Sequence, residues 1–422
     1  MIAALAFKSL RNRKLTAGLT VLSIGLAVLL LLGVERIRDE SRESFAAAVS
    51  GTDLVVGART SSVNLLLSAV FHIGNASANL RWETYRAFSA RPEVAWTIPL
   101  SLGDSHRGYR VLGTTPEYYE HLRFGRGRLL QIAQGRLPEN EHDMVLGAEV
   151  AQKLGYRPGD SIVVAHGAGD VSFSLHEQHP FKVSGVLART GTPVDRTVHV
   201  SLQGLDAMHD EAGLDAAADP FAAAPQEEHA DAEGNPHPPR AITAFLVGLK
   251  SRSAALGMQR VVNEYAGEPL TAVLPGVALQ EVWEITGAVE KTLFAVSALV
   301  VAVGLAGMLV ALLTSLSERR REMAVLRSVG ARPSQVFALI LGEAAFLTLL
   351  GIVLGVAALY AGLIAGQPWL ESRLGLFIVV GWPSAYEALL MAMVALAGVL
   401  IGLVPAWRIY RYSLADGMSI RI

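Results

Sequence analysis

Residues Leu293–Ile364 read LFAVSALVVAVGLAGMLVALLTSLSERRREMAVLRSVGARPSQVFALILGEAAFLTLLGIVLGVAALYAGLI. Two apolar runs, Leu293–Leu316 and Phe337–Ile364, flank a short charged segment. Each run is longer than the ~20 residues that a helix needs to cross a bilayer. The segment between them, Ser317–Ser334, carries five arginines, and short arginine-rich loops stay on the cytoplasmic side. This stretch therefore predicts two membrane spans joined by a cytoplasmic loop.

The loop itself has a helical pattern. Met323, Leu326 and Val329 recur at helical spacing, which predicts a short amphipathic helix on the cytoplasmic face of the membrane. Gly330 is suited to end this helix and Pro333 to begin the next one. Such a helix would pass force from a soluble partner into the membrane. On these residues alone, a basic loop that only sets the topology remains an equal alternative.

The run TSLSERRREMAVLRSVGARPSQVFALILGEAAF resembles the signature of the FtsX-type permease domain. In that family a Ser-x-x-Glu-Arg-x-x-Glu run leads into a Leu-Arg-x-x-Gly-Ala turn and then a helix with Glu-Ala. This chain has the matching residues at Ser315, Glu318, Arg319, Glu322, Leu326, Arg327, Gly330, Ala331, Glu343 and Ala344. The resemblance implies a MacB/FtsX-like ABC transporter permease whose loop docks on a separate or fused ATPase.

The resemblance also implies which residues contact that ATPase. They are Glu318, Arg319, Arg320, Arg321, Glu322, Leu326, Arg327, Gly330 and Ala331. The sequence contains no Gly-x-x-x-x-Gly-Lys-[Ser/Thr] phosphate-binding loop, so ATP and Mg²⁺ are expected on a separate partner subunit. We expect no enzyme activity and no cofactor in this chain.

Composition narrows the remaining function classes. The 422 residues have a formal net charge of −2, which offers no bulk attraction to nucleic acid. There is no cysteine, which excludes disulfides and thiol catalysis. Leu15–Val34 is too long for the apolar core of a signal peptide and is followed by charged residues, so we expect an uncleaved span.

The predicted fold is an α-helical membrane protein with four transmembrane helices and an α+β extracytoplasmic domain between helices 1 and 2. Its expected segments are a cytoplasmic amphipathic helix (1–14), first span (15–34), stalk helix (35–50), external domain (51–277), second stalk helix (278–292), second span (293–316), coupling helix (317–334), third span (337–364), external link (366–384), fourth span (385–404) and cytoplasmic tail (405–422).

The external domain alternates short β-type runs with turns, which favours an α+β arrangement. A helical-looking stretch, Ser61–Arg91, follows its first strand. The runs MVLGAEVAQKLGYRPGDSIVV and FKVSGVLARTGTPVDRTVHVSL resemble the periplasmic domain of MacB-like permeases. This second resemblance agrees with the first one.

An acidic, Ala- and Pro-rich segment at Asp206–Arg240 predicts an exposed loop. It contains His209, His229 and His237 among carboxylates, which is the chemistry of metal ligands. Their spacing matches no defined site, so a solvated acidic loop is the preferred interpretation.

The third span carries Glu343, an ionisable group at membrane depth. It is expected to act at a permease interface or in coupling, or to form a structural hydrogen bond between helices. Gly351, Gly355 and Gly362 in the same span suit close helix packing.

The expected function is the permease subunit of a MacB/FtsX-like ABC system. ATPase motion would pass through the stalk to the external domain and drive export, extraction or release of a substrate. The alternative is an FtsX-like signalling subunit that activates a periplasmic partner without cargo. The resemblance implies a permease homodimer or heterodimer in the lipid of a bacterial inner membrane, with cytoplasmic termini.

Overall fold

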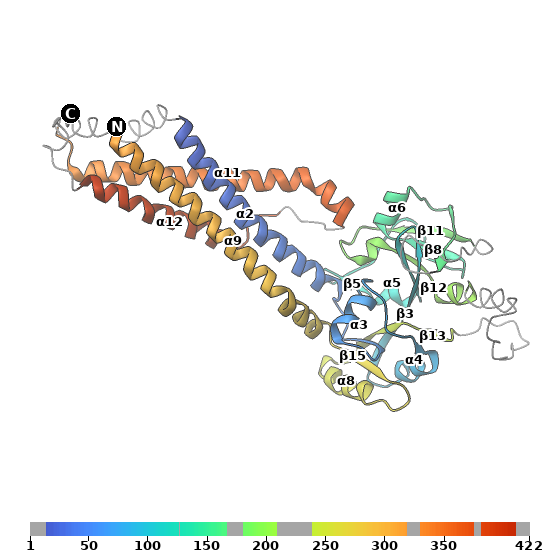
Figure 1. Cartoon of the computed structure of the whole chain (residues 1–422). Coiled ribbons are helices and arrows are strands. Elements are labelled where there is room, and N and C mark those ends of the chain that lie inside the picture. The colour runs from blue at the N-terminus through green and yellow to red at the C-terminus, as the bar shows by residue number, and fades with distance from the viewer. Residues whose placement is uncertain are drawn as a thin grey trace, which may run out of the picture. The chain divides into compact units, whose positions relative to one another are not determined.

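The computed structural model describes residues 14–125, 127–166, 180–208, 239–318, 330–374 and 381–410. The chain forms two compact units (Figure 1). One consists of long helices, and the other contains Ser41–Thr286 and is built on a large sheet.

The helical unit is formed by four helices, each with a stretch long and apolar enough to cross a membrane. They are α2 (Lys14–Ala48), α9 (Pro275–Glu318), α11 (Pro333–Leu374) and α12 (Ala385–Tyr410). In hydrocarbon a helix satisfies its own backbone hydrogen bonds, which is why long apolar runs adopt this form. Each predicted span lies within one of these helices. Residues 41–48 of α2 and 275–286 of α9 belong to the sheet unit.

Small residues allow the helices of this unit to approach closely. A Cβ atom added at Gly355 would lie 2.6 Å from the Gly25 carbonyl oxygen, and one at Gly351 would lie 2.5 Å from Ile24 Cγ2. The backbones of α2 and α11 therefore approach directly at Gly25 and Gly355, and the Ile24 side chain packs on the backbone of Gly351. Gly362 does not take part: a Cβ there would meet no atom within 4 Å. The prediction of close packing was wrong for Gly362, which lies one helical turn or more beyond the crossing.

The sheet unit contains one sheet of eleven strands among its described residues. Neighbouring strands follow the order β15 (Leu270–Val273), β1 (Leu54–Ala58), β14 (Ala244–Leu249), β3 (Val94–His106), β4 (Tyr109–Thr114), β12 (Thr197–Ser201), β8 (Asp143–Leu146), β11 (Phe181–Leu187) and β7 (Ile132–Gly135). Only the pairs β4–β12 and β8–β11 along this path are parallel.

The long strand β3 joins the two halves of the sheet. Its residues from Val94 to Leu100 pair with β14, and those from Ser101 to His106 pair with β4. Short strands complete the sheet, with β9 (Ser161–Ile162) on β11 and β10 (Ala165–His166) on β3. The result is a mixed α and β domain inserted between the first two membrane-type helices, as the sequence predicts.

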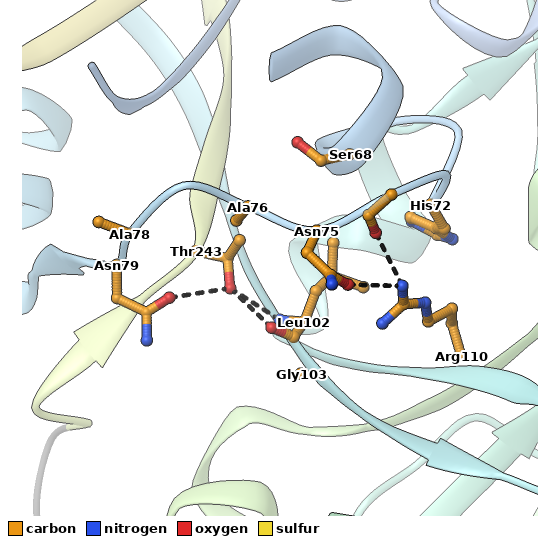
Figure 2. Close-up of a pocket in the computed structure, with 11 residues that line it drawn as sticks. Ser68, His72, Asn75, Ala76, Ala78, Asn79, Leu102, Gly103, Arg110 and Thr243 are labelled. Carbon is orange, nitrogen blue, oxygen red and sulfur yellow. Dashed lines mark hydrogen bonds between the residues drawn. The ribbon is translucent and has the colours of Figure 1, made fainter. Parts of the chain in front are cut away.

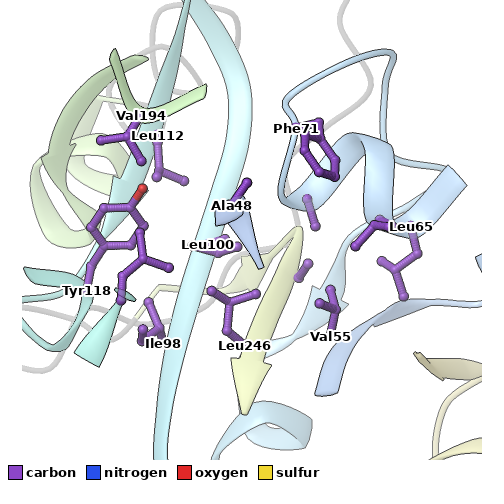
Figure 3. Packing of buried hydrophobic residues seen from close by; sticks show 14 of the residues in the cluster. Ala48, Val55, Leu65, Phe71, Ile98, Leu100, Leu112, Tyr118, Val194 and Leu246 are labelled. Atoms are coloured by element: carbon purple, nitrogen blue, oxygen red, sulfur yellow. The ribbon is translucent and has the colours of Figure 1, made fainter. Parts of the chain in front are cut away.

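A hydrophobic core fixes α3 (Ser62–Ala69) against the sheet. Leu65 and Leu66 of α3 pack with Val55, Leu100 and Leu246 of three strands (Figure 3). The helix begins at a Ser61 N-cap, whose side-chain oxygen accepts a hydrogen bond from the Asn64 N–H at 3.2 Å.

The structure corrects three sequence-based expectations. The helical-looking stretch at 61–91 is broken: α3 ends at Ala69, and β2 (Leu80–Arg81) and α4 (Trp82–Ser89) come later. Between them His72 and Gly74 have φ values of 55° and 77°, a left-handed conformation that cannot continue a right-handed helix.

The other two corrections concern boundaries. Helix α11 continues to Leu374, so the predicted external link at 366–384 begins as helix. Residues 202–208 are also helical and Met208 is only 2% exposed, so the predicted loop at 206–240 begins after a buried anchor. At Met208 apolar burial extends the helix beyond the point where the local composition changes.

Candidate functional site

The predicted ATPase-coupling residues lie at the junction between α9 and α11. Glu318 is the last residue of α9. Six of the predicted contacts fall outside the described residues, namely Arg319, Arg320, Arg321, Glu322, Leu326 and Arg327. Gly330 is exposed and has φ +104°, and Ala331 is half-buried. The helical character of the loop therefore remains a prediction.

The chain that leads from this segment into α11 has a well-defined helix start. Helix α11 begins at Pro333, a residue whose missing N–H costs nothing in the first turn. The Arg332 N–H donates to Gln335 Oε1 at 3.0 Å, so the side chain of the third helical residue reaches back to the cap. This arrangement sets the direction in which the chain leaves the loop.

Glu343 lies ten residues into α11 and is 6% exposed. Its burial agrees with the rule that ionisable groups in membrane helices face protein rather than lipid. One turn farther along, the Thr348 hydroxyl donates to the Ala344 carbonyl at 2.8 Å. The structure places Glu343 in the interior of the helical unit.

A buried ion pair that the sequence did not predict links the first and last helices of the unit. Arg36 Nη1 of α2 lies 3.4 and 3.3 Å from the two carboxylate oxygens of Glu387 in α12. The two side chains are 10% and 6% exposed. Glu40, one turn along α2, lies 3.7 Å from Arg36 Nε.

The chain before α12 completes this network. The Ser384 N–H donates to Glu387 Oε2 at 2.7 Å, and the Glu387 N–H donates to Ser384 Oγ at 3.1 Å, which forms a reciprocal cap. The Tyr360 hydroxyl of α11 donates to the Gly381 carbonyl at 2.7 Å. Three helices are thus held together by hydrogen bonds at one end of the unit.

The sequence contained a signal for this network. Glu387 is an acidic residue in the first turn of a very apolar helix, and such a group needs a partner. Its partner is 351 residues away, so no local pattern could identify it.

The residues of α2 and α9 that belong to the sheet unit pack into its core. The Phe45 ring lies 5.5 Å from the Trp283 ring, edge to face, and 4.5 Å from Phe71. The Arg42 guanidinium lies 5.4 Å from the centre of the Trp283 ring. Ala278 and Leu279 of α9 are buried in the same core. Both long helices are therefore anchored firmly in the sheet domain.

No cluster of three or more potential metal ligands occurs among the described residues. The weak candidates His209, His229 and His237 lie outside those residues.

Comparison with known proteins matches two family models to successive parts of the chain. The MacB-like periplasmic core domain matches residues 15–229, and the FtsX-like permease C-terminal domain matches residues 294–414. No curated protein matches the chain.

The solved structures that are similar to the chain include two extracytoplasmic domains. The periplasmic region of MacB from Actinobacillus actinomycetemcomitans has 13% identity and a TM-score of 0.33, and the match covers 56% of this chain and 95% of that one. The extracellular domain of the noncanonic ABC-type transporter YknZ from Gram-positive bacteria has 12% identity and a TM-score of 0.31, and the match covers 53% of this chain and 98% of that one.

Proposed function

Because the chain belongs to the MacB/FtsX-like permease family, we propose that it transmits the motion of a cytoplasmic ATPase to the sheet domain. Permeases of this family are the transmembrane components of ABC transporters and work with a cytoplasmic ATPase partner. In this proposal the partner holds ATP and Mg²⁺, the permease is a dimer in the bacterial inner membrane, and the sheet domain is periplasmic.

The observation that carries the proposal is the continuity of two helices. Helix α2 is unbroken from Lys14 to Ala48 and α9 from Pro275 to Glu318, so each contributes to both compact units. A continuous helix is stiff along its axis because every turn is hydrogen-bonded to the next. Phe45 and Trp283 then fix the helix ends in the sheet core.

The proposed cycle follows from these parts. ATP binding closes the ATPases, which displace the loop that contains Arg319–Arg321. Helix α9 carries this displacement away from the loop, and the ion pair between Arg36 and Glu387 keeps α2 and α12 moving together. The motion of the domain would export, extract or release a substrate. In the alternative function, the same motion would activate a periplasmic partner without moving cargo.

The absence of cysteine makes the test direct. Cysteines are introduced at Gly257 and Met393, both exposed, and spin-labelled in the chain reconstituted with its co-purified ATPase. We expect the distance distribution between the labels to change when ATP is added. The Arg319–Arg321→Glu variant should lose this change, whereas the Arg319–Arg321→Lys variant should keep it because the loop charge is unchanged.

Two results would contradict the proposal. One is the absence of any ATPase from the purified, gently extracted chain. The other is an ATP-dependent change that persists in the Glu variant. A periplasm-dependent reporter inserted after Gly167 should stay active in both variants, which excludes an inverted topology as the cause of any loss.

A further inference from the structure

The sheet unit contains a cleft of about 380 Å³ beside β3, β4 and the segment after α3 (Figure 2). This volume lies at the lower end of the range of small-molecule sites, roughly 300–1,000 Å³. Its polar lining consists of Ser68, His72, Asn75, Asn79, Arg110 and Thr243. None of the described lining residues is acidic.

Arg110 gives one end of the cleft a positive charge. Its Nη2 donates to the Gly74 carbonyl at 2.7 Å and to Asn75 Oδ1 at 2.9 Å, and both acceptors are neutral. These bonds hold the guanidinium in place without neutralising it. A fixed guanidinium presents parallel N–H donors, which match the two oxygens of a carboxylate.

The opposite end of the cleft is polar but uncharged. Figure 2 shows Asn79 and Arg110 at its two ends, with Leu102 and Gly103 between them. The Thr243 hydroxyl lies 3.1 Å from the Leu102 carbonyl and 3.4 Å from Asn79 Oδ1, and it accepts from the Leu102 N–H at 2.9 Å. The Asn79 carboxamide can donate to a ligand carbonyl and accept from a ligand N–H.

His72 adds an acceptor and a strained backbone to the wall. Its Nδ1 lies 2.9 Å from Thr197 Oγ1, whose own proton goes to the Pro193 carbonyl at 2.9 Å. His72 Nδ1 is therefore the donor, and Nε2 is left as an acceptor in the neutral ring. Burial, assisted by the nearby Arg110, lowers the pKa of His72 to about 4, so the ring is neutral at pH 7.

The φ value of 55° at His72 is unusual for a residue other than glycine. Such strain costs on the order of 1–3 kcal/mol and clusters at binding sites, where the surrounding structure maintains it. Here the left-handed turn directs the chain so that the Gly74 carbonyl and Asn75 reach Arg110. The strained turn thus builds the charged end of the cleft.

We propose that this cleft binds a small carboxylate whose other end is a neutral amide, such as an acylated amino acid or the C-terminal end of a peptide. Arg110 would pair with the carboxylate, and Asn79 would hydrogen-bond the amide. The short side chains Ala76 and Ala78 leave room for a small apolar group between them. This inference goes beyond the proposed transmission role and does not depend on an ATPase.

The test measures binding of N-acetyl-L-alanine to the full chain in lipid nanodiscs by isothermal titration calorimetry. We expect saturable binding, and at least about tenfold weaker binding of N-acetyl-L-alaninamide, because a charge-assisted hydrogen bond is lost. A tetrapeptide with a free C-terminus serves as a second probe. Tighter binding of the tetrapeptide identifies a polypeptide end as the ligand, and equal or weaker binding identifies a small free acid.

Two variants locate the site. Arg110→Met removes the guanidinium but also releases the 74–75 turn, so Gly103→Leu is the cleaner change. A Cβ atom at Gly103 would meet no other atom within 4 Å, so the added side chain occupies open space at the cleft. Gly257→Leu is the matched control, because a Cβ there also meets nothing and Gly257 lies on α8 (Ala255–Asn263), away from the lining.

We expect Gly103→Leu to weaken binding of N-acetyl-L-alanine at least about tenfold and Gly257→Leu to leave it unchanged. Three results would overturn the proposal: equal binding of the acid and the amide, unchanged binding in Gly103→Leu, or equally tight binding of inorganic phosphate at the same site.

Discussion

A buried histidine should make the sheet domain sensitive to acid. His199 on β12 is 0% exposed, and its ring lies 5.3 Å from the Tyr118 ring and 6.3 Å from the Tyr119 ring. Burial lowers the pKa of His199 from 6.5 to about 3, and the nearby His72 contributes to the lowering. The perturbation is acidification from about pH 7.5 to about pH 5, with and without His199→Leu.

The direction of the effect follows from proton binding in the two states. Below pH 6.5 His199 is protonated in the unfolded chain, whereas in the folded domain it stays neutral until the pH approaches 3. The contribution of neutral His199 to folding stability is therefore fully present above pH 6.5, and it is lost as the pH is lowered from 6.5 towards 3. At about pH 5 the loss from His199 amounts to about 2 kcal/mol.

Neighbouring titratable groups change the size of the acid-induced loss of folding stability but not its direction. The pKa values of His72 and His106 are also lowered by burial, so both histidines add to the loss. Burial raises the pKa of Asp195, so protonation of that carboxyl on acidification acts in the opposite direction. Burial raises the pKa values of Tyr118 and Tyr119, so both phenols remain neutral throughout.

The assay is urea unfolding of the nanodisc-embedded chain, with the folded domain quantified by a brief pulse of protease. The wild-type domain should lose more stability than the His199→Leu domain between the two pH values, by about 2 kcal/mol. Between about pH 7.5 and pH 8.5 the two proteins should respond alike, because His199 is neutral in both states there. An equal acid-induced loss in the two proteins would refute the reasoning that burial of His199 is the source.

Two further predictions concern the helical unit and the acidic segment. Arg36→Met should destabilise the detergent-extracted chain by roughly 3–5 kcal/mol, because it removes the guanidinium 3.3 Å from the buried Glu387 carboxylate. Glu387→Gln should cost less, because Glu40 still lies 3.7 Å from Arg36 Nε, and the double variant should lose less than the two single variants together; strictly additive losses in thermal unfolding would argue against a direct pair. Replacing residues 209–238 with a flexible Gly/Ser linker retains the buried Met208 and Pro239 and should change domain stability by no more than about 0.5 kcal/mol; loss of the protease-resistant domain would show that this segment contributes to the core.

The sequence by itself determined the membrane architecture. Four apolar runs identify four spans because the length and polarity of a run are local properties, and a bilayer accepts few alternatives to a helix. The FtsX-type signature between Ser315 and Ala344 and the two MacB-like runs identified the family for the same reason, since each is a contiguous pattern. The alternation of β-type runs and turns was sufficient for a mixed α and β domain.

Contacts between distant residues were decided only by the tertiary structure. Glu387 was visible as a charge in an apolar helix, but its pairing with Arg36 depends on how α2 and α12 pack. Gly351 and Gly355 lie at the crossing with α2 and Gly362 does not, although all three look alike in the sequence. The break after α3 and the cleft at Arg110 likewise depend on the left-handed turn at His72 and on strands from separate parts of the chain. Local patterns fix which residues become helix or strand, whereas burial and hydrogen bonding between distant segments fix which side chains meet.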